Sequence, residues 1–378
     1  MADLGEVVAA LDRLYDPVTA QTWDAVGLVC GDPAARVRRV RFAVDPVAVV
    51  VDEAEREHAD LLVTHHPLLL HGVHSVAATT PKGRVVHRLI RAGIALHVAH
   101  TNADCADPGV SDALAGALGL RDLVPLDAAD RPPRDKLITF VPETDADRLV
   151  EALSLAGAGV IGDYARCAFL GPGTGTFTPG PSSHPTIGRP GVIEQVPELR
   201  LEMELPRARR GVVVAALRAA HPYEEPAYDV VELAAEPGRC GLGRIGELSA
   251  PEPLSAFVQR VAAALPATVA GVRATGDPEL PIRRVAVCGG AGDSLLTTAT
   301  AADVDALVTA DLRHHPASEH AETGGPALVD VAHWASEWPW LRTAADRLAT
   351  ELDDDTVDFT VSTIVTDPWT LRALHHPA

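Results

Sequence analysis

The sequence predicts an α/β protein whose duplicated core, made of two similar halves with mainly parallel strands, is interrupted by a ferredoxin-like α+β inserted domain. Three observations support this prediction: both ends of the chain alternate strand and helix patterns, two sequence blocks recur in the same order, and the middle follows another plan. The chain of 378 residues is also longer than one hydrophobic core normally holds. We therefore expect a first core half at residues 1–129, an inserted domain at 130–247 and a second core half at 248–378.

The first half alternates short β-rich runs with amphipathic segments. In chain order we expect a strand at 37–44, a helix at 47–58, a strand at 61–64, a helix at 83–92, a strand at 94–99 and a helix at 111–118. Such alternation is typical of a layered structure in which helices connect parallel strands.

The second half repeats this plan. We expect a helix at 253–264, strands at 284–288, 306–309 and 327–331, and a helix at 340–351. The block Asp60-Leu-Leu-Val-Thr64 recurs as Asp305-Ala-Leu-Val-Thr309, and a His-His-Pro follows each copy. Further along, Val98-Ala-His100-x-x-x-Asp104 recurs as Val331-Ala-His333-x-x-x-Glu337. Two blocks in the same order indicate a folded repeat.

The middle segment reads as strand–helix–strand twice over. We expect strands at 136–141, 167–170, 199–204 and 227–233, helices at 145–156 and 210–220, and a hairpin or loop in the Gly/Thr/Ser/Pro-rich stretch 171–191. This is the split-βαβ pattern of a ferredoxin-like domain.

Charge and composition exclude several classes of function. The chain has 32 Lys+Arg against 52 Asp+Glu, a net charge of −20, so a broad nucleic-acid surface is not expected. No apolar run approaches the length of a membrane span, and the N-terminus has no basic signal region, so we expect a cytoplasmic protein without a membrane partner. The five cysteines form no C-x-x-C pair, which argues against a disulfide framework or a cysteine zinc site.

Histidines and acidic residues at strand ends are the strongest chemical signal. His65 and His66 end a buried-type strand, where open α/β sheets bind their ligands. Asp104 and Glu337 each lie four residues after a histidine, and on a helix this spacing places both side chains on one face. Imidazole and carboxylate together form the donor set of hydrolytic Zn, Mn, Fe or Co sites. A polar strand end and helix-surface pairs are the alternatives, but recurrence in a duplicated core favours two metal half-sites.

A resemblance to a known family rests on an ordered set of motifs. They are Trp23-Asp-Ala-Val-Gly-Leu-Val-Cys-Gly-Asp-Pro33, Leu62-Val-Thr-His-His-Pro-Leu68, His100-Thr-Asn-Ala-Asp104, Gly109-Val-Ser-Asp-Ala-Leu-Ala115, Thr309-Ala-Asp-Leu-Arg-His-His315 and Ala332-His-Trp-Ala-Ser-Glu337. With them the chain resembles the Nif3-like (DUF34) family, often described as GTP cyclohydrolase 1 type 2 homologues. The turn His221-Pro-Tyr-Glu-Glu-Pro-Ala-Tyr-Asp229 resembles members with a middle domain similar to PII and CutA1 proteins.

The resemblance implies a dinuclear centre of divalent metal ions, Zn, Mn, Fe or Co. By motif position its ligands would be His65, His66, Asp104, His333 and Glu337, with Glu337 as the bridge. His100 and His315 would lie beside the metals or face a substrate. Family members also look like toroidal homo-hexamers. Ala25, Ala310 and Ala332 replace an Asn and two Gly of the family pattern, and none of these changes removes a ligand.

Two functions remain open at this point. The first is a metal-dependent hydrolase of a small nucleotide-like substrate, with ring opening of GTP as the reaction that the resemblance implies. The alternative is a non-enzymatic metal-binding, metal-delivering or ligand-sensing oligomer. The Gly289–Gly292 segment lacks the Lys-Ser/Thr of a P-loop, so we interpret it as a tight strand–helix turn. Its place at a strand end near the expected metals keeps a role in binding a substrate phosphate open.

Overall fold

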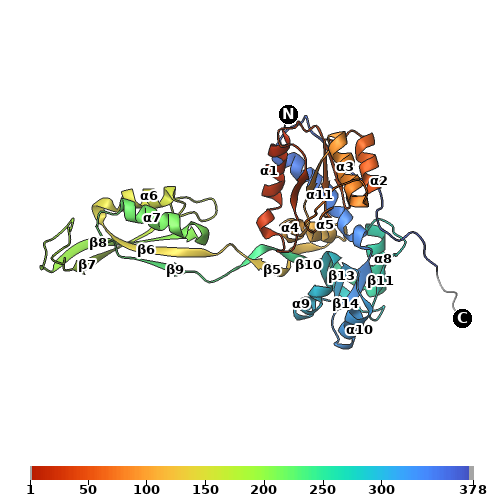
Figure 1. Ribbon diagram of the computed structural model, residues 1–378. Helices are drawn as coiled ribbons and strands as arrows, with labels where there is room; N and C mark the ends of the chain where they lie inside the picture. The colour runs from red at the N-terminus through yellow and green to blue at the C-terminus, as the bar shows by residue number, and fades with distance from the viewer. Residues whose placement is uncertain (1, 374–378) are drawn as a thin grey trace. The chain divides into compact units, whose positions relative to one another are not determined.

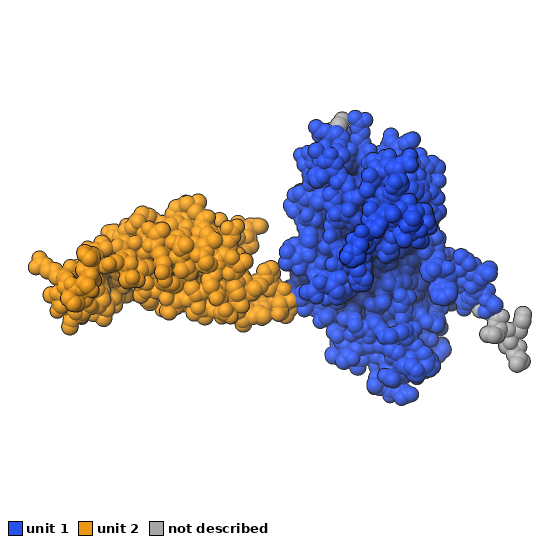
Figure 2. Space-filling model, in the orientation of Figure 1, with its two compact units in different colours: residues 1–129, 238–378 blue, residues 130–237 orange. Residues whose placement is uncertain are grey.

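The computed structural model of the protein describes residues 2–373 and divides into two compact units (Figure 2). Unit 1 combines residues 1–129 and 238–378, and unit 2 comprises 130–237. The inserted unit therefore ends at Pro237 and not at the expected residue 247. The reason is β10 (Pro237–Pro253), which pairs antiparallel with β12 (Pro281–Ala291) and so belongs to a sheet of unit 1.

The first half of unit 1, whose residues 1–129 are coloured red to orange in Figure 1, contains a five-stranded sheet in the order β1-β4-β3-β2-β15. Strands β4, β3, β2 and β15 run parallel, and β1 is antiparallel to β4. The strands are β1 (Gly27–Cys30), β2 (Arg39–Ala43), β3 (Leu61–Thr64), β4 (Ala95–Val98) and β15 (Asp358–Val361). The helices are α1 (Leu4–Leu14), α2 (Ala48–Arg56), α3 (Pro81–Ala92), α4 (Thr101–Cys105) and α5 (Val110–Ala117), with a 3-10 turn η1 (Pro17–Thr19).

The second half contains a six-stranded sheet in the order β11-β14-β13-β12-β10-β5. Strands β12, β13 and β14 run parallel. Strand β11 pairs antiparallel with β14, and β10 pairs antiparallel with β12. The remaining strands are β5 (Arg121–Asp130), β11 (Arg273–Ala274), β13 (Ala306–Ala310) and β14 (Ala327–Val331). The helices are α8 (Leu254–Ala264), α9 (Leu296–Ala301), α10 (His314–Glu322) and α11 (His333–Leu352), with η4 (Asp293–Leu295).

An aspartate marks the same point of the repeat in both halves. The Oδ2 atom of Asp60 accepts hydrogen bonds from the backbone N–H groups of Arg38 and Arg39. Asp305 Oδ2 accepts the corresponding pair from residues 283 and 284. Each aspartate therefore joins the start of one parallel strand to the start of the next. This correspondence, with the matching strand order, agrees with the duplicated core that the sequence predicts.

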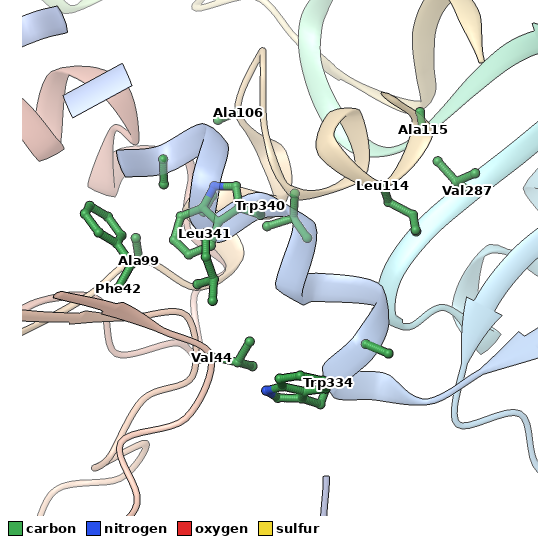
Figure 3. Close-up of a cluster of buried hydrophobic side chains, with 14 of the residues drawn as sticks. Phe42, Val44, Ala99, Ala106, Leu114, Ala115, Val287, Trp334, Trp340 and Leu341 are labelled. Carbon is green, nitrogen blue, oxygen red and sulfur yellow. The ribbon is translucent and has the colours of Figure 1, made fainter. Parts of the chain in front are cut away.

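Helix α11 holds the two halves together. Figure 3 shows Trp334, Trp340 and Leu341 of this helix between strands of the two sheets. Trp340 is fully buried, and its Nε1–H donates to the Tyr15 hydroxyl at 3.2 Å. Side chains of both halves, including Phe42 and Val287, belong to the same buried cluster. The halves therefore share one hydrophobic core, which fixes their strand ends relative to one another.

Unit 2 has the predicted ferredoxin-like topology. Its antiparallel sheet follows the order β7-β8-β6-β9, and two helices pack on it. Its elements are β6 (Arg134–Pro142), η2 (Glu143–Asp145), α6 (Ala146–Leu155), β7 (Phe169–Phe177), β8 (Glu194–Pro206), η3 (Arg207–Arg209), α7 (Arg210–Ala220) and β9 (Tyr228–Glu232). Strand β7 extends into the glycine-rich stretch because β8 pairs with it as far as Phe177. Among residues 2–373, no helix is long and apolar enough to cross a membrane.

Candidate metal centre

The carboxyl ends of parallel strands in both halves supply the histidines of the candidate site. His65 and His66 directly follow β3, and His333 follows β14 as the first residue of α11. Because the helix begins there, Glu337 lies one turn further on the same face, and its Oε1 is 2.9 Å from His333 Nε2. Helix α11 thus carries the second half's donors toward the first half's histidine pair.

Donor atoms from the two halves converge. His66 Nε2 lies 3.2 Å from His333 Nε2 and 3.1 Å from Glu337 Oε2. His65 Nε2 lies 3.4 Å from Glu337 Oε1 and 3.7 Å from Asp104 Oδ1. The structure therefore brings together all five side chains that the sequence nominated as ligands.

The Nδ1 atom of each of these histidines has an oxygen acceptor. His65 Nδ1–H donates to the Ala99 carbonyl at 2.9 Å. His66 Nδ1–H donates to Asp45 at 2.7 Å, and His333 Nδ1–H donates to Asp311 at 2.7 Å. Such bonds fix the tautomer and the ring orientation, and they leave the Nε2 lone pairs directed at the common centre.

Sequence reasoning did not identify Asp45 or Asp311 as partners of the histidines. Asp45 lies just after β2 and Asp311 just after β13, so both stand at carboxyl ends of parallel strands. The sequence signal for both aspartates was their position just after a strand. A single aspartate after a strand is common, however, and only the folded structure shows which histidine it contacts.

The arrangement fits a cation. His65 Nε2 and Asp104 Oδ1 are buried without a hydrogen-bond partner, although such an atom costs roughly 1–3 kcal/mol when left unpaired. Facing Nε2 lone pairs repel unless a positive charge lies between them. The donor atoms form two groups, and within each group all donor atoms lie within 4.8 Å of one another. One group is His65, His66 and His100, and the other is His66, His333 and Glu337. Imidazole and carboxylate donors at this spacing suit divalent Zn, Mn, Fe or Co.

The acidic and basic groups of the cluster perturb one another strongly. Burial opposes ionisation of Glu337, yet His66, His65 and His333 hold the pKa of its carboxyl well below the usual range. Burial also opposes a charge on His66, but Glu337 and Asp45 raise its pKa to about 11. Burial raises the pKa of Asp104 to about 6, an effect that His65 opposes. Positive charge is therefore strongly favoured at the centre.

A sequence profile described as Duf34/NIF3 (NGG1p interacting factor 3) matches residues 2–368. The chain belongs to the DUF34/NIF3 family. A relative from Mycobacterium leprae is 53% identical over 98% of this chain and 96% of its own length, and one from Mycobacterium tuberculosis is 54% identical over 97% of each. Both are named GTP cyclohydrolase 1 type 2 homolog.

Two solved bacterial structures have the same fold. A Bacillus cereus protein related to NIF3 matches with a TM-score of 0.77 at 33% identity. The Staphylococcus aureus protein SA1388 matches with a TM-score of 0.85 at 27% identity. Each comparison covers 98% of this chain and 99% of the other.

The remaining two histidines expected at this DUF34/NIF3 site have different positions. His100 precedes α4; its Nδ1–H donates to Asp24 at 2.8 Å, and its ring centroid is 5.2 Å from that of His65. His315, in contrast, lies exposed on α10 with its ring against His314, outside the cluster. Residues 311–313 separate β13 from this second histidine pair, so Asp311 occupies the strand end instead.

A cavity of about 840 Å³ opens onto the cluster. Its walls include His66, His333, Arg273 and the C-terminal residues Trp369 and Arg372. Its volume lies in the range of small-molecule sites. The DUF34/NIF3 cluster is thus accessible to a ligand of moderate size on the side of His66 and His333.

The Gly289–Gly292 segment makes room for the cluster. Gly290 has φ +67°, and a Cβ there would lie 2.5 Å from Glu337 Oε1. Its backbone N–H donates to Ser336 Oγ at 2.8 Å, on the turn that carries His333 and Glu337. This position therefore requires glycine both for its backbone conformation and for its closeness to the acidic donor.

Proposed function

We propose that the protein binds two divalent metal ions at this cluster and acts as a metal-dependent hydrolase of a small nucleotide-like substrate. The observation that supports this most is the convergence of Nε2 and carboxylate atoms from both halves, with each ligand imidazole held at Nδ1. His65, His66, Asp104, His333 and Glu337 would be the ligands. The Nδ1 hydrogen bonds keep the three imidazole rings in place before an ion binds.

The position of Glu337 supports two ions. Its Oε1 faces His65 and His333, while its Oε2 faces His66. Carboxylate oxygens that face different imidazoles suit a bridging ligand. His66, whose Nδ1–H donates to Asp45, would bind one of the two ions through Nε2.

The side chains define roles around that centre. When bound, a pair of divalent ions acts as a Lewis acid and lowers the pKa of water toward neutrality. Asp24 holds the Nδ1–H of His100, so the Nε2 atom of His100 is left to accept a proton from a reacting group. Arg273 and Arg372 line the adjacent cavity and would orient an anionic substituent of the substrate.

The substrate class rests on the cavity and on the relatives. A volume of about 840 Å³ would accommodate a nucleotide. The relatives from two mycobacteria are named as homologues of a GTP cyclohydrolase, and ring opening of GTP is the first reaction to test.

The test uses protein purified without a histidine tag, stripped of metal and reconstituted with Mn²⁺, Zn²⁺ or Fe²⁺. We expect hydrolysis of GTP or of a generic phosphoester in at least one reconstitution, and loss of both turnover and metal in Glu337→Gln. Two bound ions without turnover in any reconstitution would contradict the hydrolase. That result would favour the alternative of a metal-storing, metal-delivering or ligand-sensing protein.

We also propose a homo-oligomer, in the form of a toroidal hexamer. Large apolar side chains such as Val18 and Leu371 are about nine-tenths exposed, at 88% and 91%, and would be covered by subunit contacts. Light scattering coupled to size-exclusion chromatography measures the mass directly. A monomeric mass at micromolar concentration would contradict this assembly.

A further inference from the structure

A second cavity lies within unit 2, apart from the residues of the metal cluster. Its volume is about 630 Å³. Five segments form it: strands β6, β7 and β8, the loop of residues 179–187 and the turn at 223–227. The proposed hydrolase function uses none of these residues.

The turn at one wall is held by a buried histidine. His221 is 7% exposed; its Nε2–H donates to the Phe140 carbonyl at 3.0 Å, and its Nδ1 accepts the Tyr223 N–H at 3.1 Å. The loop is tied to the same turn, since Thr186 Oγ1–H donates to the Pro222 carbonyl at 2.6 Å. The backbone N–H of His184 also donates to Glu224 at 2.8 Å. The cavity walls are therefore fixed by specific hydrogen bonds.

A carboxylate at the cavity lacks a counter-ion. Glu198 is 8% exposed, and its Oε1 accepts a hydrogen bond from the Tyr223 hydroxyl at 2.7 Å. Within residues 2–373 no Lys, Arg or His forms an ion pair with it, and its Oε2 has no hydrogen-bond donor. A Cβ at position 175 would overlap this carboxyl group, so Gly175 provides the space that the acid occupies. Because Glu198 lines the cavity, a cation bound there would form an ion pair with this carboxylate.

The other walls suit the body of an organic cation. The rings of Phe177 and Tyr223 have centroids 5.9 Å apart and planes tilted by 56°, and Phe140 adds a third aromatic face. Aromatic faces attract ammonium and guanidinium groups. Arg200 lies over Phe140, but its guanidinium is paired with Glu202 at 2.7 Å and does not neutralise Glu198. Glu224 and Glu225 add further negative charge to the lining.

We propose that this cavity binds a small organic cation, an amine or guanidinium carried on an aromatic or apolar body. Its charged head forms an ion pair with Glu198 Oε2, and its body packs between Phe140, Phe177 and Tyr223. The site is distinct from the metal centre and gives unit 2 a ligand of its own.

The test compares three ligands of one shape and different charge by isothermal titration calorimetry on the full chain. Tyramine carries an ammonium group, tyrosol a neutral hydroxyl and 4-hydroxyphenylacetate a carboxylate. We expect tyramine to bind at least about tenfold more tightly than tyrosol, a difference of about 1.4 kcal/mol, and the anion to bind more weakly still. Equal affinity for tyramine and tyrosol, or no heat from tyramine at millimolar concentration, would overturn the proposal.

Three variants test whether the effect depends on Glu198. Glu198→Gln should abolish the preference for tyramine over tyrosol, whereas Glu204→Gln, on the same strand and paired with Arg134, should retain it. Tyr223→Phe keeps the ring and should weaken tyramine binding less than Glu198→Gln does. Circular dichroism melting checks that each variant folds. Retention of the tyramine preference in a folded Glu198→Gln would refute the assignment, and metal content measured alongside keeps this outcome separate from failure of the proposed hydrolase.

Discussion

The Nε2 atoms of His66 and His333 lie 3.2 Å apart, although 267 residues separate the two histidines in the chain. One follows strand β3 of the first half and the other follows strand β14 of the second. Neither half therefore contains the cluster alone. The buried core around α11 sets this distance, because it packs the two halves against one another. Packing in that core therefore determines whether the donor atoms are close enough to hold a metal.

His66→Ala should reduce bound metal from about two ions per chain to about one, because the Nε2 lone pair of His66 can bind one ion while its Nδ1–H donates to Asp45. Elemental analysis by mass spectrometry after dialysis measures this. His315→Ala is the matched control, since His315 lies on α10 outside the cluster. Equal metal content in the two variants would show that the ions bind elsewhere.

Asp311→Asn should weaken metal binding about 10–100-fold while leaving every proposed ligand in place. The reason is the 2.7 Å bond from His333 Nδ1–H, which the amide accepts less strongly than the carboxylate. Competition with a coloured chelator gives the affinity. Asp346→Asn, an exposed change on the same helix as His333, should leave the affinity unchanged. An unaltered affinity in Asp311→Asn would mean that this hydrogen bond does not orient the ring.

Gly290→Ala should abolish metal binding because its Cβ would intrude on Glu337 and His333. The control is Gly324→Ala, which has a similar φ of +72° but nothing within 4 Å of the added Cβ. Both variants carry backbone strain of about 1 kcal/mol, so both should melt slightly earlier. Only the first should lose metal in elemental analysis. Equal loss of metal in both variants would show that backbone strain, and not the intruding Cβ, prevents metal binding.

Trp340→Ala should destabilise the protein by about 3–5 kcal/mol, since it removes a fully buried side chain from the shared core. Trp369→Ala removes a side chain that is 68% exposed, and we expect a change within about 0.5 kcal/mol. Urea unfolding followed by circular dichroism compares the two. Similar midpoints would show that α11 is not the element that joins the halves.

Asp135→Asn should destabilise unit 2 by about 2 kcal/mol at pH 7. The hydrogen bond from Arg210 lowers the pKa of Asp135 despite its burial, and Arg207 adds to this effect. The folded state thus favours the ionised form, and this stabilisation is present above the unfolded pKa of about 3.9. It is lost as the pH falls through the folded pKa, so the difference from the wild type should shrink on acidification.

Calorimetric melting at pH 7 and at acidic pH measures the effect of Asp135→Asn, with the exposed Asp163→Asn as the control in the same unit. A difference between wild type and Asp135→Asn that grows on acidification would contradict the sign of this prediction.

Much of the fold was predictable because its elements carry local signals. Strand β3 and helix α7 have the predicted bounds, since one is an apolar run and the other an Ala/Val-rich amphipathic stretch. Helix α11 begins earlier than residue 340. Pro339 normally marks a helix break, and Ala332 at its start offers no side-chain cap, so local signals favoured a later start. Packing of Trp334 and Trp340 sustains the helix through the proline.

The candidate site was predictable as residue types but not as contacts. Recurrence of the histidine and acidic blocks indicated two half-sites, and the family resemblance then implied the five side chains that converge. The partners Asp45 and Asp311 depend on strand order, and a single sequence does not contain that information. Strand β15 escaped prediction for a similar reason: its four residues are mostly half-buried, and its partner β2 lies at the opposite end of the chain.

The position of β15 has a consequence for synthesis on the ribosome. This last strand completes the sheet of the first half beside β2, and α11, which presents Glu337, also comes late in the chain. A nascent chain that has exposed only residues 1–129 therefore displays His65, His66 and Asp104 without His333, Glu337 or strand β15. Under the proposed function, binding of both ions must wait until α11 has been synthesised, because His333 and Glu337 lie on that helix.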